Sequence, residues 1–213
     1  MKYTHIVWDF NGTIIDDVGI GIQSVNPLLE KRGLKPIESL DEYKKLFDFP
    51  IIDYYRRLGF DFDKEPYEKI AVEWVENYKA LSDEIPLVDG VLKALESIGN
   101  LGLKNLILSA SERDMLEDKL TKLGIIGKFE CLLALDNIYA HSKLDIAREY
   151  FADKDKSKYL MVGDTVHDFD VARKVGIDVV LVACGHQSYD KLVSTGCVVF
   201  GNMNGFKDFL EGM

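Results

Sequence analysis

The chain contains little cysteine. Cys131, Cys184 and Cys197 are spread over 213 residues and lie within apolar runs. An odd number of distant cysteines does not suit a disulfide framework or a metal knuckle, so we expect reduced thiols in the protein interior. Hydrophobic residues make up 47% of the sequence, which is enough to bury a core and argues against disorder of the whole chain.

Long hydrophobic runs are also missing. The longest stretch without Asp, Glu, Lys or Arg is residues 192–206, and its 15 residues include Ser, Thr, Gly and Asn, unlike a membrane span. The first ten residues, MKYTHIVWDF, have no long apolar core followed by a small-residue cleavage site. We therefore expect a cytoplasmic protein.

Basic residues are outnumbered, with 26 Lys and Arg against 36 Asp and Glu, and the net charge is −10 at pH 7. Such a surface repels nucleic-acid phosphates and anionic lipid headgroups. We therefore expect neither nucleic acid nor a membrane as a partner. A local positive site for a small anion stays open.

Short apolar runs alternate with amphipathic stretches along most of the chain. The alternation predicts an α/β fold with a Rossmann-like parallel sheet, because buried parallel strands read as continuous apolar runs. The expected strands are residues 4–8, 105–110, 131–135, 159–162 and 179–183, and the expected helices between them are 91–98, 115–123, 144–151 and 169–175.

The alternation breaks once, between the first expected strand and residue 85. This segment has helical periodicity and no convincing strand, and the expected helices are residues 18–32, 39–47, 51–58 and 66–81. We therefore predict an all-helical cap domain at residues 16–85, inserted into a core formed by residues 1–15 and 86–213. Helices inserted at this point lie beside the carboxyl ends of the strands, where α/β proteins bind ligands.

Polar groups follow several of the expected strands. Asp9 ends the first strand within Asp-Phe-Asn-Gly-Thr, Ser109 ends the second, Lys143 begins a helix, and Asp164 and Asp168 follow the strand at 159–162. In a doubly wound sheet these strand ends meet at one crevice. The sequence therefore predicts a single site that contains all of these side chains.

The charges of this site favour a divalent cation. Asp9, Asp164 and Asp168 would raise one another's pKa values if no cation were present, since crowded like charges disfavour ionisation. Mg²⁺ suits a site with a few carboxylates, a backbone carbonyl, waters and a phosphate oxygen. Lys143 and the Ser109 hydroxyl supply donors for an anion, and one carboxylate could attack a bound phosphorus atom.

These four motifs, residues 9–13, Ser109, Lys143 and residues 163–168 in that order, resemble those of the haloacid dehalogenase superfamily of phosphatases. The resemblance covers the whole chain. The inserted helices resemble the cap of the phosphoglycolate phosphatase and β-phosphoglucomutase branch. The resemblance implies Mg²⁺-dependent hydrolysis of a small phosphorylated metabolite through an aspartyl-phosphate intermediate.

The resemblance also implies a role for each matching residue. Asp9 is the nucleophile and a metal ligand, and Ser109 and Lys143 hold the phosphoryl oxygens. Asp164 and Asp168 complete the metal site together with the backbone carbonyl of Asn11. The phosphate cradle is completed by groups near the substrate, mainly backbone N–H groups, at Phe10, Gly12, Thr13 and Ala110.

Asn11 departs from the family pattern, which has Asp two residues after the nucleophile. That acid protonates the leaving alkoxide and activates water, and a group of this kind contributes roughly 10²–10⁴-fold. An amide cannot exchange the proton at neutral pH. Asn11 is therefore assigned to the catalytic residues as the position on which the reaction rate depends.

Four hypotheses accommodate Asn11. The protein is a slow phosphatase or one with a good leaving group; or Asn11, followed by Gly, deamidates to the missing Asp. Alternatively it cleaves C–halogen or C–P bonds, although dehalogenation needs no metal and no cap lysine stands out for C–P cleavage. Finally, it is a catalytically weakened relative that binds a phosphorylated ligand without turnover. We take the phosphatase as the leading hypothesis, with a monomer as the default state.

Three histidines, His141, His167 and His186, are expected near the mouth of the site. No pair among them shows metal-ligand spacing. We treat them as residues that support the site from its surroundings.

Overall fold

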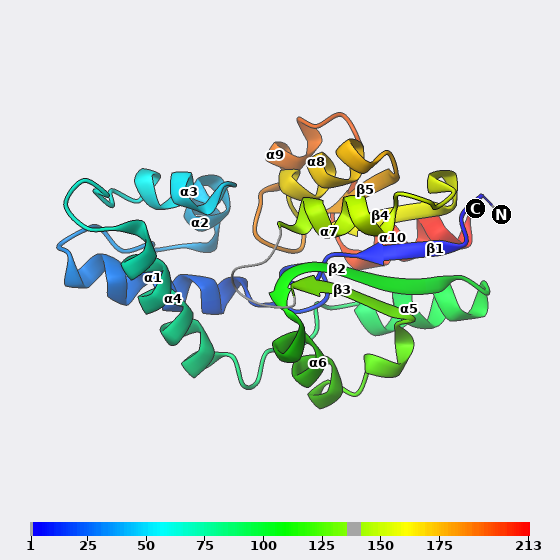
Figure 1. Cartoon of the computed structure of the whole chain (residues 1–213), viewed down its shortest axis with the longest axis horizontal. Coiled ribbons are helices and arrows are strands. Elements are labelled where there is room, and N and C mark those ends of the chain that lie inside the picture. Colours follow the sequence, from blue (N-terminus) through cyan, green and yellow to red (C-terminus); the bar gives the residue numbers. More distant parts are fainter. Residues whose placement is uncertain (1, 136–141) are drawn as a thin grey trace.

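The computed structural model describes residues 2–135 and 142–213. Within these residues, six parallel strands form one sheet in the order β3-β2-β1-β4-β5-β6 (Figure 1), which confirms the expected Rossmann-like α/β fold. The strands are β1 (His5–Trp8), β2 (Lys104–Glu112), β3 (Cys131–Leu135), β4 (Tyr159–Gly163), β5 (Asp178–Val182) and β6 (Val198–Phe200).

Helices pack on both faces of this sheet. They are α5 (Val91–Asn100), α6 (Arg113–Lys122), α7 (Lys143–Tyr150), α8 (Val166–Val175), α9 (Tyr189–Val193) and α10 (Met203–Glu211), with short 3₁₀ helices at Ile126–Lys128 and Lys156–Lys158. Strand β6 and helices α9 and α10 were not expected from the sequence. Strand β6 has only three residues, which is too short for a periodic pattern to show.

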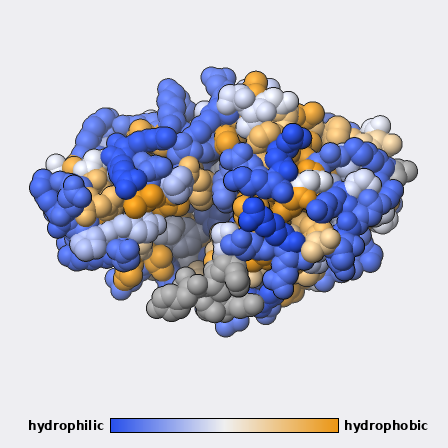
Figure 2. Space-filling model, turned by 45° about the horizontal axis from the view of Figure 1, so that its top comes forward, coloured by the Kyte–Doolittle hydropathy of each residue, from blue (hydrophilic) through white to orange (hydrophobic). Residues whose placement is uncertain are grey.

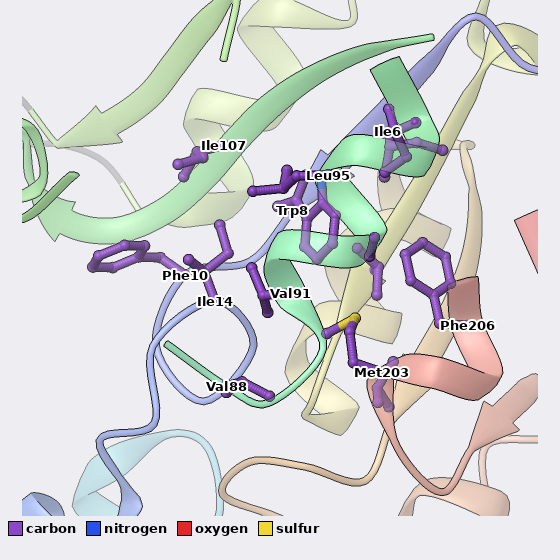
Figure 3. Packing of buried hydrophobic residues seen from close by; sticks show 14 of the residues in the cluster. Ile6, Trp8, Phe10, Ile14, Val88, Val91, Leu95, Ile107, Met203 and Phe206 are labelled. Atoms are coloured by element: carbon purple, nitrogen blue, oxygen red, sulfur yellow. The ribbon is translucent and has the colours of Figure 1, made fainter. Parts of the chain in front are cut away.

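The central strand β1 shows why the sheet is buried on both faces. Its side chains alternate, so Val7 packs in one hydrophobic cluster with residues of α7 and α8. Ile6 and Trp8 point to the other face, into a cluster that includes residues of α5, α6 and α10. Figure 3 shows Trp8 in this second cluster, where its ring meets that of Phe206 edge-on at 5.7 Å. Because both faces are covered, the three buried positions of β1, Ile6, Val7 and Trp8, are all apolar.

The inserted segment contains four helices, α1 (Val18–Lys31), α2 (Leu40–Leu46), α3 (Ile51–Arg57) and α4 (Tyr67–Leu81). They lie beside the sheet, on the left in Figure 1, and share a hydrophobic cluster of their own. The two connections to this segment run side by side, since the Asp16 N–H donates to the Pro86 carbonyl at 2.9 Å and Ile15 pairs with Leu87.

The surface contains mainly hydrophilic residues on the face shown in Figure 2, with a narrow hollow between the helical segment and the sheet. None of the helices in the part of the chain that the structure describes combines the length and apolar character needed to cross a membrane. The three cysteines are free thiols, but each is only partly buried rather than in the protein interior as expected.

The strand order determines where the site lies. Strand β1 pairs with β2 on one side and with β4 on the other. Strands β2 and β3 therefore extend the sheet in one direction from β1, and β4, β5 and β6 extend it in the opposite direction. Ligand sites of open α/β sheets lie at the carboxyl ends of the strands next to such a reversal.

Candidate active site

The loop after β1 positions Asp9. The Asp9 N–H donates to the Val162 carbonyl of β4 at 2.9 Å, which holds this residue at the reversal point. The Phe10 carbonyl then accepts bonds from the N–H groups of Ile14 and Ile15, and the Phe10 side chain lies in the core. Phe10 therefore contributes only backbone groups to the site.

Gly12 occupies a position in this loop that no other residue fits. Its φ of +74° is left-handed, and a Cβ atom added there would lie 2.6 Å from the His186 ring. The loop can therefore approach the segment after β5 closely only because residue 12 is glycine.

Lys143 is the first residue of α7. Ser142 and Asp145 form a capping box at the start of this helix, which fixes where Lys143 enters the site. The Lys143 side chain is buried, and its ammonium group donates to the carboxylates of Asp9 and Asp168, the latter at 2.6 Å.

Asp164 and Asp168 come from the end of β4 and the first turn of α8. Asp164 accepts bonds from the Thr13 hydroxyl at 2.9 Å and the His186 N–H at 2.6 Å. Asp168 accepts bonds from the hydroxyl and the N–H of Thr165, which caps α8. The structure thus brings together the three aspartates singled out in the sequence, with carboxylate oxygens of Asp9, Asp164 and Asp168 within 4.8 Å of one another.

The carboxylates in this cluster carry more negative charge than Lys143 balances. Burial and the charge of Asp168 raise the pKa of Asp9 well above its usual range, against the effect of Lys143. Burial raises the pKa of Asp164 to about 6, although the charge of His186 opposes this. For Asp168 burial acts in the same direction, but Lys143 outweighs it and lowers the pKa.

This donor set fits a divalent cation. Three carboxylates share a buried cluster with one ammonium group, and burial together with the charge of Asp168 raises the pKa values of Asp9 and Asp164. A hard cation with oxygen ligands relieves such crowding of negative charge. The cluster of Asp9, Asp164 and Asp168 is therefore of the kind that holds a divalent metal.

Ser109 lies in β2 just where the pairing with β3 becomes irregular. It is buried, and its hydroxyl donates to the Ser111 hydroxyl at 3.0 Å. The Ser111 hydroxyl in turn donates to the side-chain Oδ1 of Asn11 at 3.0 Å. The structure thus connects Ser109 to the loop after β1 through Ser111, a residue that the sequence analysis did not single out. Ala110, which lies between the two serines, is exposed.

Two residues expected near the substrate have other partners. The Thr13 hydroxyl bonds to Asp164, and Thr13 is fully buried. The Gly12 N–H donates to the Ile15 carbonyl at 3.0 Å and to Asp17 Oδ1 at 2.8 Å. These groups therefore order the loop and the carboxylate cluster.

Asn11 is held by hydrogen bonds at both ends of its amide. Its Nδ2 donates to Asp17 Oδ2 at 2.7 Å and to the Tyr78 hydroxyl at 3.0 Å, and its Oδ1 accepts from Ser111. Deamidation requires the next backbone nitrogen to attack this amide. Because the Gly12 N–H is already bonded twice, the geometry disfavours the hypothesis that Asn11 converts itself to Asp.

The sequence interpretation missed Asp17 and Tyr43, and it treated His186 only as a neighbour of the site. His186 is buried, and its ring bonds to Asp17 at 3.2 Å and to the Tyr43 hydroxyl at 2.8 Å. Phe47 stacks on the same ring at 4.8 Å. Residues of the inserted helices thus contact the loop after β5, and no local sequence signal reports a contact between segments so distant.

The structure describes only one of the other two histidines that were expected near the site. His167 stacks on Phe49 at 4.5 Å, so it also lies where the inserted segment meets the sheet. His141 lies outside the described residues.

Paired with Asp17, His186 makes the stability of the metal-free protein depend on pH. Burial acts to lower its pKa, but Asp17 outweighs burial and raises the pKa to about 9. The stabilisation is therefore complete below about pH 6.5, the pKa of an unfolded histidine, and is lost as the pH rises through about 9. We expect the free energy of unfolding to fall by up to about 3 kcal/mol across this window, measured by urea denaturation in chelator. His186→Gln should make the free energy of unfolding nearly independent of pH in this window. An unchanged pH dependence in that variant would contradict the role given to the ion pair between His186 and Asp17.

The chain resembles known proteins over most of its length. The sequence profile of the family described as haloacid dehalogenase-like hydrolase matches residues 6–182. A phosphoglycolate phosphatase of Synechococcus elongatus is 28% identical over 197 residues, which are 89% of this chain and 88% of that protein. The tyrosine-protein kinase PtkA of Mycobacterium tuberculosis is 24% identical over 198 residues, 91% of this chain and 67% of that protein.

Solved structures share the fold. A haloacid dehalogenase-like hydrolase from Streptococcus pneumoniae has a TM-score of 0.80 at 17% identity and covers 97% of this chain and 98% of its own. The structure of Mycobacterium tuberculosis PtkA also has a TM-score of 0.80, at 22% identity, with 98% of both chains covered. The fold is of the α/β class, and the family whose profile matches consists of hydrolases. The chain belongs to the haloacid dehalogenase-like hydrolases, in the branch that includes the phosphoglycolate phosphatases.

Proposed function

We propose that the protein is a Mg²⁺-dependent phosphatase that hydrolyses a small phosphorylated metabolite through an aspartyl-phosphate at Asp9. One observation carries the proposal. The Lys143 ammonium group bridges the carboxylates of Asp9 and Asp168, and Asp164 lies in the same cluster. This arrangement supports the proposal, because phosphoryl transfer depends on a nucleophile beside positive charge that balances the phosphate.

Each residue has a distinct role in the proposed reaction. An Asp9 oxygen attacks phosphorus, the bond to the leaving oxygen breaks, and water later cleaves the acyl phosphate to return the carboxylate. Lys143 offsets the negative charge of Asp9 and binds phosphoryl oxygens. The Ser109 hydroxyl and the backbone N–H groups of Phe10 and Ala110 complete the phosphate cradle.

Asp9, Asp164, Asp168 and the Asn11 carbonyl would hold Mg²⁺. The bound ion would supply positive charge that lets an anionic phosphate enter an acidic pocket. Thr13 orients Asp164 through the hydrogen bond between their side chains. Asp164 is thereby kept in place for the ion.

We also propose that residues 16–85 act as a cap over a core formed by residues 1–15 and 86–213. The separate hydrophobic cluster of α1–α4 supports this division. The cap meets the core through Tyr43, Phe47 and His186, and Lys191 donates to the Phe47 carbonyl at 2.9 Å. Closure of such a cap excludes water from the reacting groups.

Metal removal and leaving-group chemistry test the proposal. In excess chelator we expect hydrolysis of p-nitrophenyl phosphate to fall by about 100-fold or more, and Mg²⁺ should restore it. Because Asn11 supplies no proton, aryl and acyl phosphates should be cleaved roughly 10²-fold or more faster than alkyl phosphates such as glycerol phosphate and phosphoglycolate. Phosphate release measures both effects. Full activity in chelator would contradict the metal role, and equal rates would contradict the missing proton donor.

A second candidate is a protein that binds a phosphorylated ligand with little turnover. The closed hydrogen-bond network around Asn11 favours it, because no acid is available at this position. Inorganic phosphate binding, measured by calorimetry in Mg²⁺ without hydrolysis of any ester, would select this candidate.

A further inference from the structure

Asp17 is a buried carboxylate that the proposed reaction does not use. It lies at the N-cap of α1, where an Asp side chain normally accepts a bond from the helix N-terminus, yet its side chain makes no capping bond. A lost cap costs about 1 kcal/mol in a typical helix. The carboxylate is therefore turned away from its own helix toward other partners.

Those partners come from three separate parts of the fold. Asp17 Oδ2 accepts bonds from Asn11 Nδ2 at 2.7 Å and from the Tyr78 hydroxyl of α4 at 2.9 Å. Asp17 Oδ1 accepts bonds from the Gly12 N–H at 2.8 Å and pairs with His186 at 3.2 Å. One carboxylate thus connects the loop that carries the nucleophile, the inserted helices and the segment after β5.

The contacts of Asn11 are complementary to this carboxylate. Its Nδ2 has two acceptors, Asp17 and Tyr78, while its Oδ1 accepts from Ser111. Turning the amide over would direct its oxygen at the Asp17 carboxylate. The Asp17 charge therefore selects a single orientation of the Asn11 side chain.

We propose that Asp17 is a positioning residue that acts through Asn11, and that the two form a matched carboxylate–amide pair beside the nucleophile. The proposal rests on the proposed phosphatase function. It means that position 11 must be neutral as long as position 17 is charged. An Asp at position 11 would place two carboxylates 2.7 Å apart in a buried site, which is strongly unfavourable.

The pair can be exchanged without loss of a hydrogen bond. In the double variant Asn11→Asp/Asp17→Asn, the new amide at position 17 would keep its oxygen toward the Gly12 N–H and His186 and donate from its nitrogen to the new carboxylate. That carboxylate would accept bonds from Tyr78 and, at its other oxygen, from Ser111. The net charge and the shape are conserved, although the carboxylate no longer faces His186, so the exchanged pair should restore most of what each single variant loses.

A double-mutant cycle tests the pair. We expect Asn11→Asp and Asp17→Asn each to lower kcat for p-nitrophenyl phosphate in Mg²⁺ by about tenfold or more, with KM changed less than about threefold. Each should also lower Tm by about 4 °C or more. The double variant should return to within about threefold of the wild-type kcat. Its Tm should lie above the value that the sum of the two single losses gives, and below that of the wild type because the ion pair between Asp17 and His186 is lost. The control Asp16→Asn makes the same change at an exposed neighbour and should leave both values unchanged.

The outcomes separate this proposal from the proposed function. Additive losses in the double variant would overturn the pair, as would an Asn11→Asp protein that gains activity at unchanged Tm. If the wild type hydrolyses no phosphate ester, the phosphatase proposal fails, but the Tm cycle still decides whether the pair exists. If activity is restored by the exchange, Asp17 has a role that a merely structural residue would not show.

Discussion

Asp9→Asn is expected to reduce hydrolysis of aryl phosphates by a factor on the order of 10⁴ or more, because the amide cannot serve as the nucleophile. The structure indicates that this substitution removes the nucleophile and leaves the surrounding contacts largely unchanged. Asparagine has the shape of aspartate, the backbone bond to Val162 is unaffected, and Lys143 keeps Asp168 as a partner. Steady-state kinetics in Mg²⁺ measures the effect.

Stability provides the control for this variant. Burial and the neighbouring carboxylate raise the pKa of Asp9, which means that its charge is unfavourable in the folded protein without metal. Asp9→Asn should therefore leave Tm in chelator unchanged or higher, so that catalysis is lost while the fold is kept. A variant with more than about 1% of wild-type activity would exclude Asp9 as the nucleophile.

Lys143→Met is expected to affect both stability and activity. It removes a buried ammonium group that lies between two buried carboxylates, and breaking a buried ion pair in this way costs about 3–5 kcal/mol. For a chain of this length we expect Tm in chelator to fall by about 10 °C. Hydrolysis should fall as well, by about 10²-fold or more, because the phosphoryl group loses its fixed positive partner.

A matched control and a metal titration sharpen this test. Lys158→Met makes the same change at an exposed position and should leave Tm within about 1 °C. Mg²⁺ should recover part of the lost Tm in Lys143→Met, because it also balances the carboxylate charge, but it should not restore the rate. An unchanged Tm in Lys143→Met would contradict the buried bridge.

The order of strands and helices could be read from the sequence because hydrophobic periodicity is local. Residues 6–8 and 159–162 are continuous apolar runs, and both lie in buried strands that are next to each other in the sheet. Strand β6 could not be read in this way. Its three residues pair with β5, and that pairing is a contact between segments rather than a property of the segment itself.

The site shows the same division between local and distant information. Asp9, Asp164 and Asp168 each follow a strand that is recognisable from its own residues, so the sequence predicted that they would meet. The Ser109 hydroxyl was expected near the phosphate, but its link to Asn11 through Ser111 depends on an irregular stretch of β2. No periodicity marks that irregularity.

The sequence by itself determined the fold class, the family and the carboxylate cluster, because each depends on residue types at the ends of locally encoded strands. Only the tertiary structure decided what surrounds Asn11. Asp17 is six residues away in the chain, but Tyr78 and His186, which help to hold its carboxylate, are 61 and 169 residues from it. A buried charge is stable only where distant donors converge on it, and the packing of the inserted helices against the sheet brings those donors together.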